Sequence, residues 1–175
     1  MAYTFDTARL GLMPIANKDS GVTQPGASSA TPTPPLTLGM VVTATDPTNG
    51  TGEFILLAGV ASTVVGSLVT YNTTSYTTAL APVGANKPQP IAIAMSANTS
   101  ASTWGWYQIS GVAVAKKTSG LALASAAAVG VLTAGLVAAT GTGKEIQGAL
   151  TVAKSTASPT VKLVINRPHM QGRIT

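Results

Sequence analysis

Residues 121–141, LALASAAAVGVLTAGLVAATG, form a run of 21 residues without a charge, a proline or an aromatic side chain. A run of this length is long enough for an apolar helix that spans a bilayer. The chain must therefore use it either as a membrane span or as β-structure. Gly130 and Gly135 are each followed by apolar residues, as in short strands separated by bends. Neither end carries the aromatic residues typical of a membrane interface. We predict β-structure and no membrane partner.

The same run is similar to an earlier part of the chain. Two blocks align with each other: 61–69 with 124–132, and 84–97 with 141–154. In the second block Ile93 falls on Leu150 and Met95 falls on Val152. The first copy also contains the polar sequence YNTTSYTT, which a bilayer would not accept. Self-similarity of this kind indicates two copies of one strand-turn-strand unit.

Short β-branched and apolar runs recur along the chain, separated by turn residues. They cover 36–45, 54–62, 66–72, 90–97, 104–116 and 160–166. Between the first two lies DPTNGTGE, whose Asp-Pro and Asn-Gly pairs are strong turn formers. In PIAIAMSA the larger residues Ile91, Ile93 and Met95 alternate with smaller ones, which predicts a strand with one buried face. The fold class is all-β, an antiparallel barrel or sandwich built from the two quasi-repeated units.

The predicted organisation is an N-terminal arm followed by one β domain. Residues 1–35 form the arm and residues 36–175 the domain. The first unit spans about 52–97 and the second about 115–166, followed by a polar C-terminal tail at 167–175. The arm carries scattered apolar anchors and then a Ser-, Thr-, Gly- and Pro-rich linker that cannot form a core of its own, so we expect an extended arm. Its anchors are Tyr3, Phe5, Leu10, Leu12, Met13 and Ile15.

The chain uses little charge, because Asp, Glu, Lys and Arg make up only 9% of its 175 residues. Its 14 serines and 26 threonines supply the polarity instead. A surface of small and hydroxyl-bearing residues is poorly protected against sticking to other proteins. This composition favours a chain whose surface is covered in an assembly.

The net charge of +5 does not have the pattern of a nucleic-acid binder. The ten basic residues are spread from Arg9 to Arg173, and the only adjacent pair is Lys116-Lys117. Nucleic-acid binders concentrate Lys and Arg on one face or in one run. We therefore expect no nucleic-acid partner. The chain has no cysteine and hence no thiolate metal site, and its N-terminus lacks the pattern of a secretory signal.

The residues that could carry catalysis are few and scattered. The single histidine, His169, lies near the C-terminus, where no orienting partner is evident. Asp46 and Glu53 flank the DPTNGTGE loop, but turn formation explains its composition better than calcium binding does. The GTGK sequence at 141–144 is followed by Glu145 rather than Ser or Thr, so it does not fit a phosphate-binding loop. We predict that the protein is not an enzyme and has no cofactor, no metal site and no catalytic residue.

The aromatic cluster Trp104, Trp106 and Tyr107 allows two interpretations. In the first, Trp106 or Tyr107 belongs to the core and Trp104 packs at its edge. In the second, the rings form an exposed platform that stacks on a sugar or anchors a partner.

The series of runs resembles a family of tailed-bacteriophage virion proteins, the capsid decoration or cement proteins. The resemblance is most specific in GEFILLAGVAS (52–62) and GWYQISG (105–111), and the arm sequence ARLGLMPI (8–15) is similar to the family's N-terminus. It implies a structural protein on the outer surface of the phage capsid, bound to the major capsid protein and to itself as a homotrimer. Its expected partner-interface residues are Tyr3, Phe5, Arg9, Leu10, Leu12, Trp104 and Tyr107.

Two other functions stay open at this point. A head fibre or a host-glycan-binding module of the virion surface would use Trp104 and Tyr107 as an exposed platform. An internal or connector protein would touch DNA through its basic residues, and its binding would weaken steeply with salt.

Overall fold

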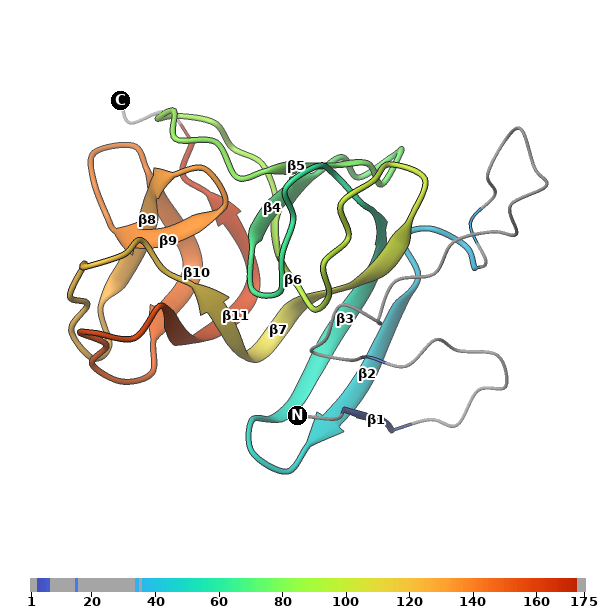
Figure 1. The fold of residues 1–175 in the computed structure, drawn as a ribbon, viewed down its shortest axis with the longest axis horizontal. Coiled ribbons are helices and arrows are strands. Elements are labelled where there is room, and N and C mark those ends of the chain that lie inside the picture. The colour runs from blue at the N-terminus through green and yellow to red at the C-terminus, as the bar shows by residue number, and fades with distance from the viewer. Residues whose placement is uncertain (1–2, 7–14, 16–33, 35, 173–175) are drawn as a thin grey trace.

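The computed structural model describes residues 3–6, 15, 34 and 36–172, and its regular elements are β-strands (Figure 1). The strands are β1 (Thr4–Phe5), β2 (Val41–Asp46), β3 (Gly50–Ala58), β4 (Leu68–Tyr71), β5 (Thr78–Leu80), β6 (Ile91–Ala94), β7 (Trp104–Lys116), β8 (Ala128–Thr133), β9 (Leu136–Ala139), β10 (Glu145–Thr151) and β11 (Thr160–Met170). The all-β prediction is confirmed. The described part of the chain contains no helix with the length and apolarity needed to cross a membrane.

The strands form one antiparallel sheet whose main path runs β1-β2-β3-β7-β11-β10-β8-β9. A branch leaves this path at β7, where β6 pairs with β7 and also with β4, and β4 pairs in turn with β5. The long strand β7 joins the two halves of the molecule, because its first half pairs with β3 and its second half pairs with β11 (Figure 1).

The internal repeat predicted from the sequence is present in this topology. We call β3–β7 unit 1 and β7–β11 unit 2, so that β7 belongs to both. In each unit the second and third strands form a hairpin, and the fourth strand pairs with the second and with the last. Two backbone hydrogen bonds confirm the alignment of Met95 with Val152: Met95 N donates to Trp106 O at 3.1 Å, and Val152 N donates to Lys162 O at 2.9 Å.

Both units curl back on themselves, although the single sheet does not close into a continuous hydrogen-bonded ladder in either unit. In unit 1 the amide of Ala58, at the end of β3, donates to Tyr76 O at 3.1 Å. In unit 2 the amide of Thr118, just after β7, donates to Val137 O at 2.9 Å. Each unit therefore encloses an interior, as expected of a barrel-like β fold.

The uncharged run 121–141 contributes β8, β9 and the turn between them. Gly135 lies in that turn with φ of +73°, a conformation that glycine adopts without steric cost. Val129, Val131 and Val137 point into the interior of unit 2 and are fully buried. The run is apolar because it fills a β core.

Three apolar clusters hold the molecule together. The first fills unit 2, the second fills unit 1, and the third lies on the outer face of unit 1. The outer cluster combines β2, β3, β7 and Met95, directly after β6, with N-terminal residues. Its members are Ile15, Val42, Ala44, Phe54, Leu56, Ala58, Met95, Trp104 and Trp106, with Tyr3, Phe5, Leu36, Leu38 and Met40 packed against them.

Strand β6 differs from the prediction of a strand with one buried face, because all four of its residues are buried. Ala92 and Ala94 belong to the core of unit 1, whereas Ile91 and Ile93 belong to the core of unit 2. The reason is the position of β6 between the two units. Gln89 lies just before β6, and its carbonyl accepts a hydrogen bond from Met170 N at 2.9 Å. This bond joins the segment before β6 to the end of β11.

Strand β11 extends into the segment that the sequence assigned to a polar tail at 167–175. It continues to Met170, whose side chain is fully buried. A register shift opposite Gln147 and Ala149 lets the strand pass its polar middle, where Arg167 has a φ of +42°. Alternation of buried and exposed residues is interrupted at Asn166 and Arg167, which are both exposed, and resumes at Pro168, so polarity alone did not mark the end of the strand.

Candidate interaction surfaces

The aromatic cluster belongs to the core, as the first interpretation proposed. Trp104 is 4% exposed, Trp106 1% and Tyr107 0%. Tyr107 lies inside unit 1, and the two tryptophans lie in the outer cluster. The interface role expected for Trp104 and Tyr107, and the stacking platform of the glycan hypothesis, both require accessible rings. The described structure buries these rings.

A buried asparagine fixes the position of Tyr107. With its amide oxygen facing the surrounding donors, Asn98 accepts hydrogen bonds from Tyr107 Oη at 3.0 Å, Gly59 N at 3.2 Å and Gly105 N at 3.3 Å. Burial raises the pKa of Tyr107 to about 12. The hydroxyl is thus a neutral structural group at physiological pH.

The described arm residues pack on the chain's own core. β1 pairs with β2, the ring of Tyr3 meets Phe54 edge-on with 4.8 Å between centroids, and Phe5 meets Trp106 at 6.2 Å. Both arm rings are half-buried, and Tyr3 and Phe5 contact their own chain. The other expected interface residues of the arm, Arg9, Leu10 and Leu12, lie outside the described residues.

Asp46 and Glu53 serve the fold at different places. Asp46 is buried, and its Oδ1 accepts from the amides of Thr48 and Asn49 at 2.9 Å each, which closes the turn between β2 and β3. This confirms the turn predicted from DPTNG. Glu53 points outward and pairs with Arg167 at 3.1 Å. Among the described residues no group of three or more potential metal ligands comes together.

His169 lies on β11 with its side chain exposed. It pairs across the sheet with Gln147 and bridges to Pro90 through the backbone. Its role in the described structure is that of a strand residue.

Lys117, half of the only adjacent basic pair, is buried at 3% exposure. Its ammonium donates to three backbone carbonyls, Leu121 O at 2.5 Å, Thr156 O at 2.9 Å and Ser155 O at 3.3 Å. This ammonium joins two loops of unit 2, and its burial makes it unavailable to a nucleic acid.

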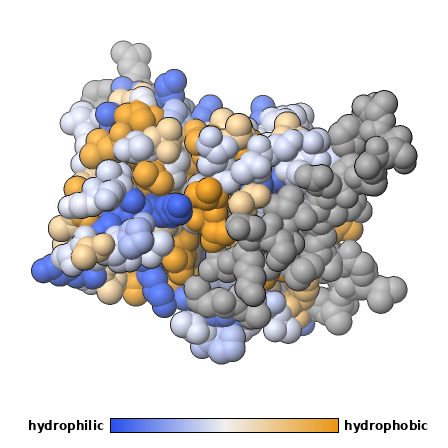
Figure 2. Space-filling view, in the orientation of Figure 1, coloured by the Kyte–Doolittle hydropathy of each residue, from blue (hydrophilic) through white to orange (hydrophobic). Residues whose placement is uncertain are grey.

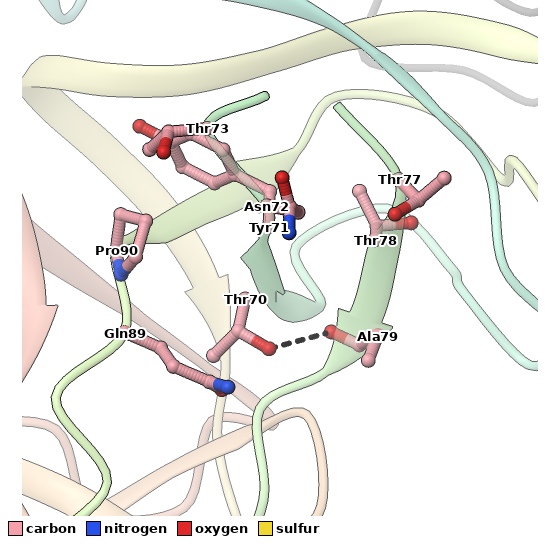
Figure 3. A pocket seen from close by; sticks show the side chains of 9 residues that line it. All are labelled: Thr70, Tyr71, Asn72, Thr73, Thr77, Thr78, Ala79, Gln89 and Pro90. Carbon is pink, nitrogen blue, oxygen red and sulfur yellow. Dashed lines mark hydrogen bonds between the residues drawn. The ribbon is translucent and has the colours of Figure 1, made fainter. Parts of the chain in front are cut away.

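A shallow hollow of about 360 Å³ lies between β4, β5 and the segment before β6 (Figure 3). Its wall is rich in threonine, and Tyr71 and Gln89 contribute larger side chains. Several polar groups of the wall are already used by the fold. Asn72 Oδ1 accepts from the amides of Thr74 and Ser75, and Thr78 Oγ1 donates to Ala58 O. Few groups remain to recognise a ligand.

A second surface was missed by the sequence interpretation, and it is apolar. Leu150, Val152 and Val164 are 47%, 44% and 48% exposed. Leu150 pairs directly with Val164 across β10 and β11, and Val164 pairs with Val112 on β7. Figure 2 shows patches of apolar surface near the middle of the visible face. We call these four residues together with Val114 the open face of unit 2.

The signal for the open face was present in the sequence. In TVKLVIN both alternating sets contain valine or another apolar residue, with Val161, Leu163 and Ile165 in one set and Lys162 and Val164 in the other. The first set is buried and the second exposed. An apolar residue in the solvent-facing set marks a candidate contact surface.

No known protein-family model matches this chain, and no curated protein matches it.

Proposed function

We propose that the chain is a structural virion protein, a capsid decoration or cement protein that binds the outside of the assembled phage head and stabilises contacts between major capsid proteins. The observation that carries the proposal is the open face of unit 2. Leu150 and Val164, on β10 and β11, and Val152, directly after β10, are each close to half exposed at positions where polar residues would be the default. An exposed apolar face of this kind is typical of a protein that is covered by a partner in an assembly.

Other properties support the same function. Residues 36–117 resemble the decoration-protein family, and the chain has the scarce charge and the Ser- and Thr-rich surface of a protein that is covered by neighbours. A cement protein acts by mass action, because it binds the assembled shell and not its separated subunits. Catalysis has no part in this function, and the polar groups described above are engaged in the fold.

The proposed partners are the major capsid protein and other copies of the same chain. We propose a homotrimer, since three linked copies multiply individually weak contacts with the shell through effective concentration.

The test is co-sedimentation with heads that lack the chain. The purified chain is first characterised by light scattering, then mixed with empty heads of the phage that encodes it and sedimented. We expect stoichiometric co-sedimentation and a higher melting temperature of the heads. A trimer that leaves the heads unbound and their melting temperature unchanged would overturn the cement function.

The alternative is a head-fibre or host-glycan-binding module. With Trp104 and Tyr107 buried, such a module would have to use the threonine-rich hollow of Figure 3, where Tyr71 supplies an aromatic ring. Binding to a glycan array that is lost in Tyr71→Ala, together with failure to bind heads, would favour this alternative.

A further inference from the structure

The repeat gives each exposed residue of unit 2 a counterpart in unit 1. In unit 1 Leu56 pairs with Trp106, and Met95 donates from its amide to Trp106 O. In unit 2 Val114 pairs with Lys162, and Val152 donates from its amide to Lys162 O. The outer faces of the two units are therefore built at the same positions of the same topology.

The two outer faces differ in what covers them. In unit 1, Leu56 and Trp106 are 0% and 1% exposed, and Met95 is 6% exposed. Their cover includes the short extended segment of Tyr3 and β1, and further apolar side chains come from Ile15 and from Leu36, Leu38 and Met40 at the turn before β2. In unit 2 the counterpart of Met95, Val152, is 44% exposed, and no described segment covers the face. Unit 1 thus shows the kind of occupant that this face accepts, an extended segment with apolar side chains.

The open face continues into a hollow at each end. At one end a hollow of about 540 Å³ is lined by Val114 and by Lys154 and Lys162, among others. At the other end a hollow of about 320 Å³ is lined by Leu150 and Val164 and reaches Glu145. Together they extend the apolar stripe into a shallow track across β7, β11 and β10.

The charges along this track define the chemistry of the occupant. Lys154 and Lys162 are exposed at one end, and no described carboxylate forms an ion pair with either of them. At the other end lies Glu145, so two lysines and one carboxylate leave the track positive overall. A segment with carboxylates at one end and apolar residues after them would complement the track.

We propose that the open face of unit 2 is the shell-binding site, and that its occupant is an extended segment of the capsid shell protein whose apolar side chains lie over Val114, Val152 and Val164 and whose carboxylates lie at Lys154 and Lys162. This assignment rests on the proposed cement function and specifies its binding site. The other candidate occupant is a second copy of the chain. That contact would bring two positive tracks together, and it is an outcome of the test below.

The test compares surface variants of the full chain for binding to heads that lack it. Leu150→Thr/Val164→Thr removes the apolar stripe but keeps β-compatible side chains at exposed positions. Lys162→Glu reverses the charge at the basic end. The matched control is Val83→Thr, at a valine that is 38% exposed but lies between β5 and β6. Melting of each isolated variant checks that it is folded.

We expect the double variant and Lys162→Glu each to weaken binding to heads about tenfold or more, and Val83→Thr to change it less than about twofold. Binding by the wild-type chain should weaken as salt is raised, and binding by Lys162→Glu should respond less. Folded track variants that bind heads as tightly as wild type would overturn the assignment while leaving the cement function intact.

Two further outcomes separate this assignment from the function on which it rests. If the track variants lower the mass found by light scattering, a second copy is the occupant and the assignment is wrong. If the wild-type chain does not bind heads at all, the cement function is overturned and the assignment falls with it.

Discussion

Three buried polar residues, Lys117, Asp46 and Asn98, hold loops of this protein in place. The ammonium of Lys117 is buried and donates hydrogen bonds to three backbone carbonyls. Asp46 closes a turn with its carboxylate, and Asn98 joins the end of β3 to β7. Burying such groups is costly unless their hydrogen bonds are made. Each therefore fixes the conformation of a loop that local backbone propensity would not determine.

Lys117 provides a direct test of this role. Lys117→Met keeps the aliphatic stem but removes the ammonium that donates to the carbonyls of Leu121, Ser155 and Thr156, of which Ser155 O keeps the amide of Leu123 as a donor, and we expect the free energy of unfolding to fall by about 2–4 kcal/mol. Lys116→Met is the matched control, because Lys116 is the adjacent residue and only partly buried. It should change the free energy by less than about 0.5 kcal/mol. Urea denaturation measures both, and equal effects would contradict the structural role of the ammonium.

At the scale of elements, β1 is the shortest strand and among the most informative. It consists of Thr4 and Phe5, yet it places two arm rings on Phe54 and Trp106. Ladder hydrogen bonds of so short a strand contribute little by themselves. Its position is held by the apolar contacts of its side chains.

Phe5→Ala tests whether β1 is held in this way in solution. Because the ring is half-buried, we expect a loss of about 1–2 kcal/mol in the free energy of unfolding, below the range for a fully buried Phe. Thr4→Ala, on the same strand with an exposed side chain, should change it by no more than about 0.5 kcal/mol. Chemical denaturation monitored by circular dichroism gives both values. An unchanged stability of Phe5→Ala would mean that the arm ring does not rest on its own core.

For the molecule as a whole, the two units are not separable domains. They share β7, and Ile91 and Ile93 from unit 1 complete the core of unit 2. A destabilising substitution in one unit should therefore also lower the stability of the other. Among the described residues the open face belongs to unit 2 alone, so the repeat has one covered outer surface and one exposed apolar surface.

Cooperative unfolding follows from this shared construction. Both tryptophans lie in unit 1, so their fluorescence reports on that unit. Val131→Ala removes two methyl groups from the core of unit 2 and should cost about 2 kcal/mol. We expect the tryptophan-fluorescence midpoint to move together with the far-ultraviolet dichroism midpoint, as in a two-state transition. A fluorescence midpoint that stays at the wild-type value would show that unit 1 unfolds independently.

Local patterns predicted many of the elements. The run 104–116 matches β7 at both ends, the DPTNG turn lies between β2 and β3, and the alignment of Met95 with Val152 matches the pairing of the strands. These features depend on neighbouring residues, because β-branching, alternation and turn chemistry act over a few positions. The end of β11 was missed, since its last residues pair with partners far away in the sequence.

The sequence by itself determined that this chain is β-structure, that it repeats, and that its uncharged run belongs to a core. Only the tertiary structure decided which apolar residues are covered. Met95 and Val152 occupy equivalent positions, but one is 6% exposed and the other 44%, because apolar residues that precede β2 pack on the outer face of unit 1 and no described segment packs on that of unit 2. Whether an apolar side chain is covered depends on packing between segments that are distant in the sequence, which no local pattern records. The open face was therefore found only in the tertiary structure.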